Sequence, residues 1–94
     1  MSRFAAAALG LELRLAWPNA HFLAWDGYHH HLGLNTWAGV GAPPPPPDAA
    51  HLLAYELLFP NEGALQPVLE RLDEAGVTAS ANEHGWLVQD PSKN

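Results

Sequence analysis

The chain has 94 residues, of which 48% are hydrophobic and 15% charged, a composition typical of one small globular domain or of part of a larger one. Its formal net charge of −6 argues against a nucleic-acid-binding surface and against a polybasic membrane contact. It has no cysteine, which excludes disulfides and thiolate chemistry, and no apolar stretch long enough to cross a bilayer. We therefore expect a cytoplasmic protein that binds neither nucleic acid nor membrane.

The first part of the chain predicts the end of a helix followed by a three-stranded meander. Residues 4–9 carry four consecutive alanines and lead to Gly10, the pattern of a helix that ends there. Apolar and polar residues then alternate with the period of half-buried strands, interrupted by turn-forming pairs. The strands are expected at residues 11–15, 21–25 and 28–37, joined by turns at Pro18-Asn19 and Asp26-Gly27.

A proline-rich linker divides the chain. The five consecutive prolines favour an extended polyproline II spacer, so we assign residues 1–41 to a first part, 42–50 to the linker and 51–94 to a second part. In the second part, one apolar stripe with helical spacing is flanked by short strand-like stretches. The elements expected there are a strand at 52–59, a helix at 62–75, strands at 77–81 and 86–89, and a turn at Asp90-Pro91-Ser92.

Three adjacent histidines stand in the third predicted strand. Alternation along a strand places His29 and His31 on one face with Asn35, and His30 on the other face with the leucines at the following even positions. We expect those leucines to mark the face packed on a helix. A His-x-His pair on the open face can chelate a metal if a third ligand is supplied. The alternative is that these histidines shape and polarise a pocket, or lie at solvated strand ends, without binding metal.

The same region offers candidates for binding an aromatic ligand. Trp25 and Trp37 can stack on an aromatic ring, and the Asn35 side chain can hydrogen-bond a polar group. The alternative for the tryptophans is a place in the core or an interface, and for Asn35 a place at the end of the strand.

The stretch Gly-Tyr-His-His-His-Leu-Gly-Leu-Asn-Thr-Trp at residues 27–37, followed by Gly41-Ala42 and the proline run, resembles the bacterial extradiol ring-cleaving dioxygenases of the catechol 2,3-dioxygenase type. These enzymes belong to the vicinal oxygen chelate superfamily, with glyoxalase I and the bleomycin resistance proteins. Residues 9–13 resemble the corner between helix and second strand of one module. Residues 90–94 resemble the Asp-Pro-x-Gly-Asn turn of the next module, with Lys93 in place of the family's glycine.

The resemblance implies a fold built from βαβββ modules, two of which pair to form a cupped sheet around a divalent metal. This chain would supply half of one module (βββ) and most of a second (βαββ). We therefore predict a glyoxalase-like α+β fold with a mostly antiparallel, cupped sheet. Because such a sheet would have open edges, we also predict a homodimer in which strands of one chain complete the sheet of the other.

The resemblance implies a dioxygenase that uses Fe(II) or Mn(II) to cleave a small, catechol-type aromatic substrate, with His29 or His31 as acid–base residue. The family's own metal ligands lie on strands outside residues 1–94, or align with Ala54. Glu56 shares the face of Ala54 and is the carboxylate candidate for a metal beside His31. The alternative is a non-catalytic domain of the same fold, without a cofactor, that binds a small aromatic ligand or only dimerises. We expect the isolated chain to be inactive.

Overall fold

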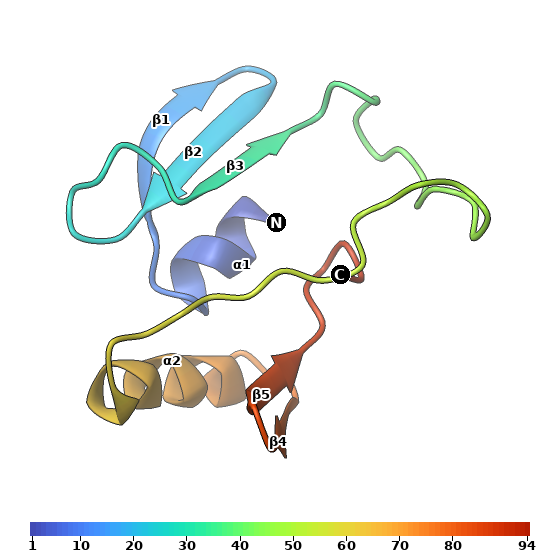
Figure 1. Ribbon diagram of the computed structural model, residues 1–94. Helices are drawn as coiled ribbons and strands as arrows, with labels where there is room; N and C mark the ends of the chain where they lie inside the picture. The colour runs from blue at the N-terminus through green and yellow to red at the C-terminus, as the bar shows by residue number, and fades with distance from the viewer.

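The computed structural model describes residues 1–94 and contains two helices and two small antiparallel sheets (Figure 1). The predicted α+β class with antiparallel strands is confirmed, and the arrangement is consistent with a glyoxalase-like domain. The elements are α1 (Ser2–Ala7), β1 (Glu12–Trp17), β2 (Ala20–Ala24), β3 (Leu32–Asn35), α2 (Glu62–Glu74), β4 (Ala79–Asn82) and β5 (Gly85–Val88). Neither helix has the length and apolar character needed to cross a membrane.

The first part forms the predicted helix and the first two predicted strands. The first helix begins earlier than expected and ends before Gly10, whose φ of 77° turns the chain into β1. β1 and β2 pair antiparallel around the turn at Pro18-Asn19, and β3 pairs with the other side of β2. A bulge at Arg14 shifts the register between the Leu13–Leu23 and Leu15–Phe22 pairs.

The prediction of one long third strand is wrong. Asp26 and Gly27 both adopt positive φ, and Tyr28 N–H donates to the Trp25 carbonyl at 3.2 Å, so a tight turn does form there. Strand pairing, however, resumes only at β3, and the histidine run lies in the loop between the strands. One reason is visible at His31, whose Nδ1 accepts the backbone N–H of Trp25 at 3.2 Å. The Trp25 N–H therefore donates to a side chain, whereas in a continuous strand ladder it would donate to a backbone carbonyl of the third strand.

The strand predicted at 52–59 is not formed either, because no neighbouring strand pairs with it. Residues 36–61 contain no helix or strand. The segment 52–59 is nevertheless extended and crosses the molecule between the three-stranded sheet and α2 (Figure 1). Its side chains keep the period of two, since Tyr55, Leu57 and Phe59 are partly buried and the residues between them are exposed.

The second part forms the predicted helix and hairpin. Asn61 caps α2 by accepting the Ala64 N–H at 2.9 Å, and Val68 and Leu72 of its apolar stripe are buried. β4 and β5 pair as an antiparallel hairpin, within two residues of the predicted strands. The turn predicted at Asp90-Pro91-Ser92 is present.

The core lies where α1 is enclosed between the three-stranded sheet and α2 (Figure 1). Leu32 and Leu34 of β3 pack against this core, which confirms that the leucines mark the helix-facing side of the strand. Arg71 of α2 donates from Nε and Nη2 to the carbonyls of Ala8 and Leu9 at 3.3 and 3.4 Å. These bonds satisfy carbonyls at the end of α1 and join the two parts of the chain. The buried side chains that form this core are Ala5, Ala8, Leu9, Leu11, Leu23, Val68 and Leu72.

Candidate functional site

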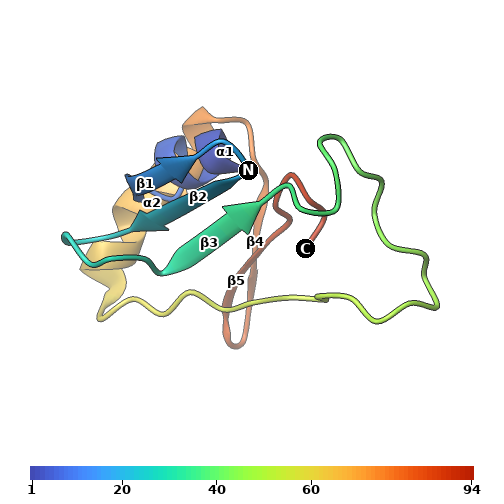
Figure 2. The same cartoon turned by 90° about the horizontal axis from the view of Figure 1, so that it is seen from above.

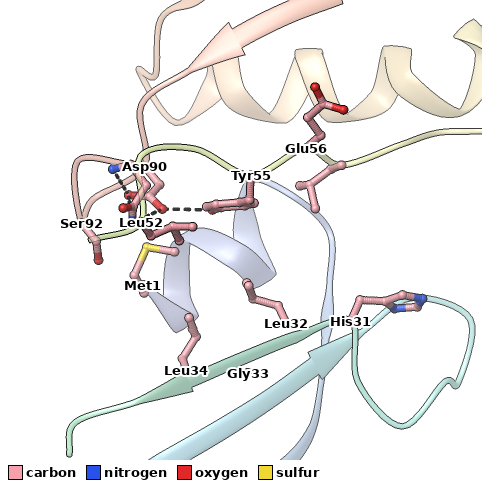
Figure 3. A pocket seen from close by; sticks show the side chains of 12 residues that line it. Met1, His31, Leu32, Gly33, Leu34, Leu52, Tyr55, Glu56, Asp90 and Ser92 are labelled. Atoms are coloured by element: carbon pink, nitrogen blue, oxygen red, sulfur yellow. Dashed lines mark hydrogen bonds between the residues drawn. The ribbon is translucent and has the colours of Figure 1, made fainter. Parts of the chain in front are cut away.

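An open cavity of about 320 Å³ lies between β3, the extended segment 52–59 and the C-terminal turn (Figure 3). One part of its wall is apolar and comes from β3 and from the extended segment. The other part is polar and comes mainly from the C-terminal turn. The apolar wall includes Leu32, Leu34, Leu52 and Leu57, and the polar wall includes Tyr55, Asp90, Ser92 and Asn94.

The polar wall is organised around Asp90, whose side chain is the one buried polar group and is only 6% exposed. Its carboxylate accepts the Tyr55 hydroxyl at 3.0 Å, the backbone N–H of Asn94 at 2.9 Å and the Asn94 side-chain amide at 3.3 Å. Three donors thus compensate the burial of one negative charge. The cluster ties the extended segment to the C-terminal turn and gives the cavity a fixed edge.

Tyr55 is held in its neutral form by these surroundings. Burial, the hydrogen bond to Asp90 and the charge of that carboxylate raise the pKa of Tyr55 to about 12. The hydroxyl therefore keeps its proton at alkaline pH values where a free tyrosine loses it, and it donates this proton to Asp90 in a hydrogen bond. Because a hydroxyl also has acceptor lone pairs, the Tyr55 oxygen can still accept a hydrogen bond from a ligand.

The two predicted metal-binding residues, His31 and Glu56, line this same cavity. Their side chains do not converge, however, because the Glu56 carboxylate points toward α2 and the His31 ring points away from Tyr55 and Asp90 (Figure 3). No three His, Cys, Asp or Glu side chains come together in a way that could hold a metal ion. Ala54, at the family's ligand position, is exposed and has no donor atom. The residues present therefore do not fit a resident Fe(II) or Mn(II) centre.

The other candidate residues lie outside the cavity. The His29 ring packs on Tyr28 with centroids 4.1 Å apart, in the loop before β3. The Trp25 indole contacts Phe59 and donates from Nε1 to the Leu9 carbonyl at 3.2 Å, which is a packing role.

Asn35 and Trp37 lie just beyond the cavity, at and after the end of β3. The Asn35 side chain accepts the backbone N–H of Trp37, whose side chain is 72% exposed. As with His29 and Trp25, a role in binding stays a prediction for both residues.

The sequence pattern does not single out Tyr55 and Asp90, which form the polar wall. Tyr55 stands in an apolar, strand-like stretch, and Asp90 has the turn-forming residue Pro91 after it. The one available signal is the phenol itself, because a partly buried tyrosine hydroxyl usually finds a hydrogen-bond partner. Its partner lies 35 residues away along the chain, beyond the range of any local pattern.

Among curated proteins, the catechol-2,3-dioxygenase of Bacillus subtilis (strain 168) is 38% identical to this chain over 90 residues. The match covers 94% of this chain and 32% of the relative, so the chain spans about a third of the length of the curated relative it matches. No family model and no solved structure matches the chain. Over nearly its whole length, the chain is therefore similar to part of a catechol-2,3-dioxygenase.

Proposed function

We propose that this chain is a glyoxalase-like domain of the extradiol dioxygenase group, and that its own activity is to bind a small phenolic molecule rather than to cleave it. The 38% identity to the Bacillus subtilis protein supports the family assignment. The observation that carries the binding role is the cavity beside β3, where an apolar wall faces a hydrogen-bonded polar wall.

The size and lining of the cavity suit a single aromatic ring. Its volume of about 320 Å³ lies at the lower end of the range of small-molecule pockets, about 300–1,000 Å³. Leu32, Leu34 and Leu57 offer apolar contacts to the ring. The Tyr55 oxygen, with its proton donated to Asp90, is placed to accept a phenolic hydroxyl proton in a hydrogen bond. Ser92 adds a hydroxyl that can donate or accept at the same wall.

Ring cleavage is the second candidate function, and the similarity to a catechol-2,3-dioxygenase favours it. Within this chain, however, the side chains of His31 and Glu56 do not assemble a metal site with a third ligand. Any cleavage would therefore need metal ligands that residues 1–94 do not bring together, and we derive no catalytic step from these residues.

Titration of the protein with catechol and phenol, followed by backbone amide NMR, tests the binding role. Saturable shifts are expected at residues of the cavity, and cyclohexanol should give weaker ones. Tyr55→Phe should weaken binding about fivefold, since one neutral hydrogen bond is worth about 1 kcal/mol. Tyr28→Phe is the matched control, because Tyr28 lies outside the cavity. The affinity of this variant for phenol and catechol should equal that of the unchanged protein. Absence of saturable shifts at the cavity would contradict the proposal.

The ring-cleaving alternative is tested in the same preparation. The protein is incubated anaerobically with Fe(II) or with Mn(II), mixed with catechol and oxygen, and followed by oxygen uptake. We expect no uptake above that of the free metal. Sustained, protein-dependent uptake would replace the binding role by catalysis.

A further inference from the structure

The extended segment 52–59 is a strand in conformation and composition, but its backbone has no partner. It contains neither glycine nor proline, and six of its eight residues are leucine, tyrosine or phenylalanine. None of its backbone N–H or C=O groups forms a hydrogen bond to another backbone group. Figure 2 shows the segment along the rim of the molecule, with no helix or strand running beside its outer edge. Unpaired strand edges of this kind are templates for strand addition.

The segment is held in place by its inward-facing side chains. Leu57 and Phe59 pack against the core, and the Phe59 ring meets Trp25 with centroids 5.5 Å apart. The Tyr55 hydroxyl donates to Asp90 at 3.0 Å. Because the extended conformation exists before any partner arrives, pairing costs less conformational entropy than the ordering of a free peptide.

The exposed side chains of the segment are mostly apolar. Leu53 is 76% exposed and Leu58 is 89% exposed, and Glu56 is the one charged residue between 52 and 59. A partner strand beside the segment would satisfy the backbone groups and would bring its own side chains next to Leu53 and Leu58, which lie on opposite faces of the segment.

We propose that segment 52–59 pairs antiparallel with the same segment of a second copy of this chain, forming a two-fold symmetric dimer. A second copy is a suitable partner because segment 52–59 is already extended in both chains. A single strand pairing then satisfies the open backbone edge of each chain. Charge permits the pairing as well. With Tyr55 opposite its own copy, Glu56 faces Ala54, so no two carboxylates stand directly across from each other.

Two adjacent proline variants test the edge itself. Neighbouring residues of a strand direct their N–H groups to opposite edges, so only one of Leu53→Pro and Ala54→Pro removes a donor from the paired edge. The other removes a donor from the free edge and is the matched control. Both residues are exposed and have no backbone partner, so both variants should fold. We expect one variant to raise the dimer dissociation constant about tenfold or more and the other to change it less than about twofold.

The mass of the full chain in solution is measured by light scattering after size exclusion and by sedimentation over a range of concentrations. The expected mass is twice the 10.2 kDa of the monomer. In the same samples, hydrogen exchange should be slowed at alternate amides of 52–59 as the concentration rises. A monomer at every concentration, or a dimer whose 52–59 amides all exchange freely, would overturn the proposal. A dimer that is equally insensitive to both proline variants would overturn it too.

Discussion

The Tyr55–Asp90 contact predicts a measurable change in the pKa of one phenol. Three causes raise the pKa of Tyr55 from 10.0 to about 12, of which burial is the largest, followed by the hydrogen bond to Asp90 and the charge of its carboxylate. Asp90→Asn removes the charge and leaves the burial. The pKa of Tyr55 should therefore fall in this variant but stay above its ordinary value.

The raised pKa also makes stability depend on alkaline pH. The folded state keeps the proton on Tyr55 up to about pH 12, whereas the unfolded chain loses it near pH 10. The stabilising contribution is thus fully present below pH 10 and is lost as the pH rises to about 12. Two pKa units correspond to about 2.7 kcal/mol, which we reduce to about 1 kcal/mol because Tyr55 is only partly buried and solvent screens the contact.

Tyrosinate absorbance measures this titration directly. The chain has two tyrosines, so Tyr28→Phe leaves Tyr55 as the one phenol that titrates. Urea unfolding of the same variant at pH 9 and near pH 11 should show stability falling by about 1 kcal/mol or less. A Tyr55 pKa near 10 with Asp90 intact would refute the contact. A pKa that Asp90→Asn leaves unchanged would assign the whole shift to burial.

Three further predictions concern two residues with positive φ and the predicted metal ligand His31. Lys93 adopts a φ of 68°, so Lys93→Gly should stabilise the protein by about 1 kcal/mol in urea unfolding, and a loss of stability would contradict this. Gly10→Ala should lower the free energy of unfolding by about 2 kcal/mol, because φ is 77° and the new Cβ would displace the Arg71 guanidinium from its carbonyl partners. An unchanged melting temperature would contradict this prediction. Dialysis against Fe(II) or Mn(II) should leave less than stoichiometric metal on the protein, equally in His31→Ala. If the protein instead bound stoichiometric metal and His31→Ala lost it, the metal site predicted from the sequence would be supported.

Local periodicity in the sequence was enough to determine several elements. The apolar stripe predicts α2 to within a residue, because this signal acts within a few turns of one helix. Alternation predicts β1 and β2, and it places Leu32 and Leu34 on the helix-facing side of β3. The similarity to dioxygenases likewise comes from the sequence alone.

The candidate site was only partly predictable. His31 and Glu56 were both named from the sequence and do line one cavity, but the directions of their side chains depend on the loop before β3 and on α2. The sequence does not predict Tyr55 and Asp90 as site residues, since their contact joins residues that no local pattern relates.

Only the tertiary structure decided which strand-like stretches became strands. The histidine run lies in the loop before β3: the His31 imidazole accepts the Trp25 N–H, and the one backbone hydrogen bond from the run to β2 is that of His31 N–H to the Leu23 carbonyl. Segment 52–59 kept its alternating burial without becoming a strand, because strand formation needs a second backbone within hydrogen-bonding distance and none runs beside it. A sequence pattern specifies which face of a segment is buried, whereas hydrogen-bond partners distant in the chain are specified by the fold.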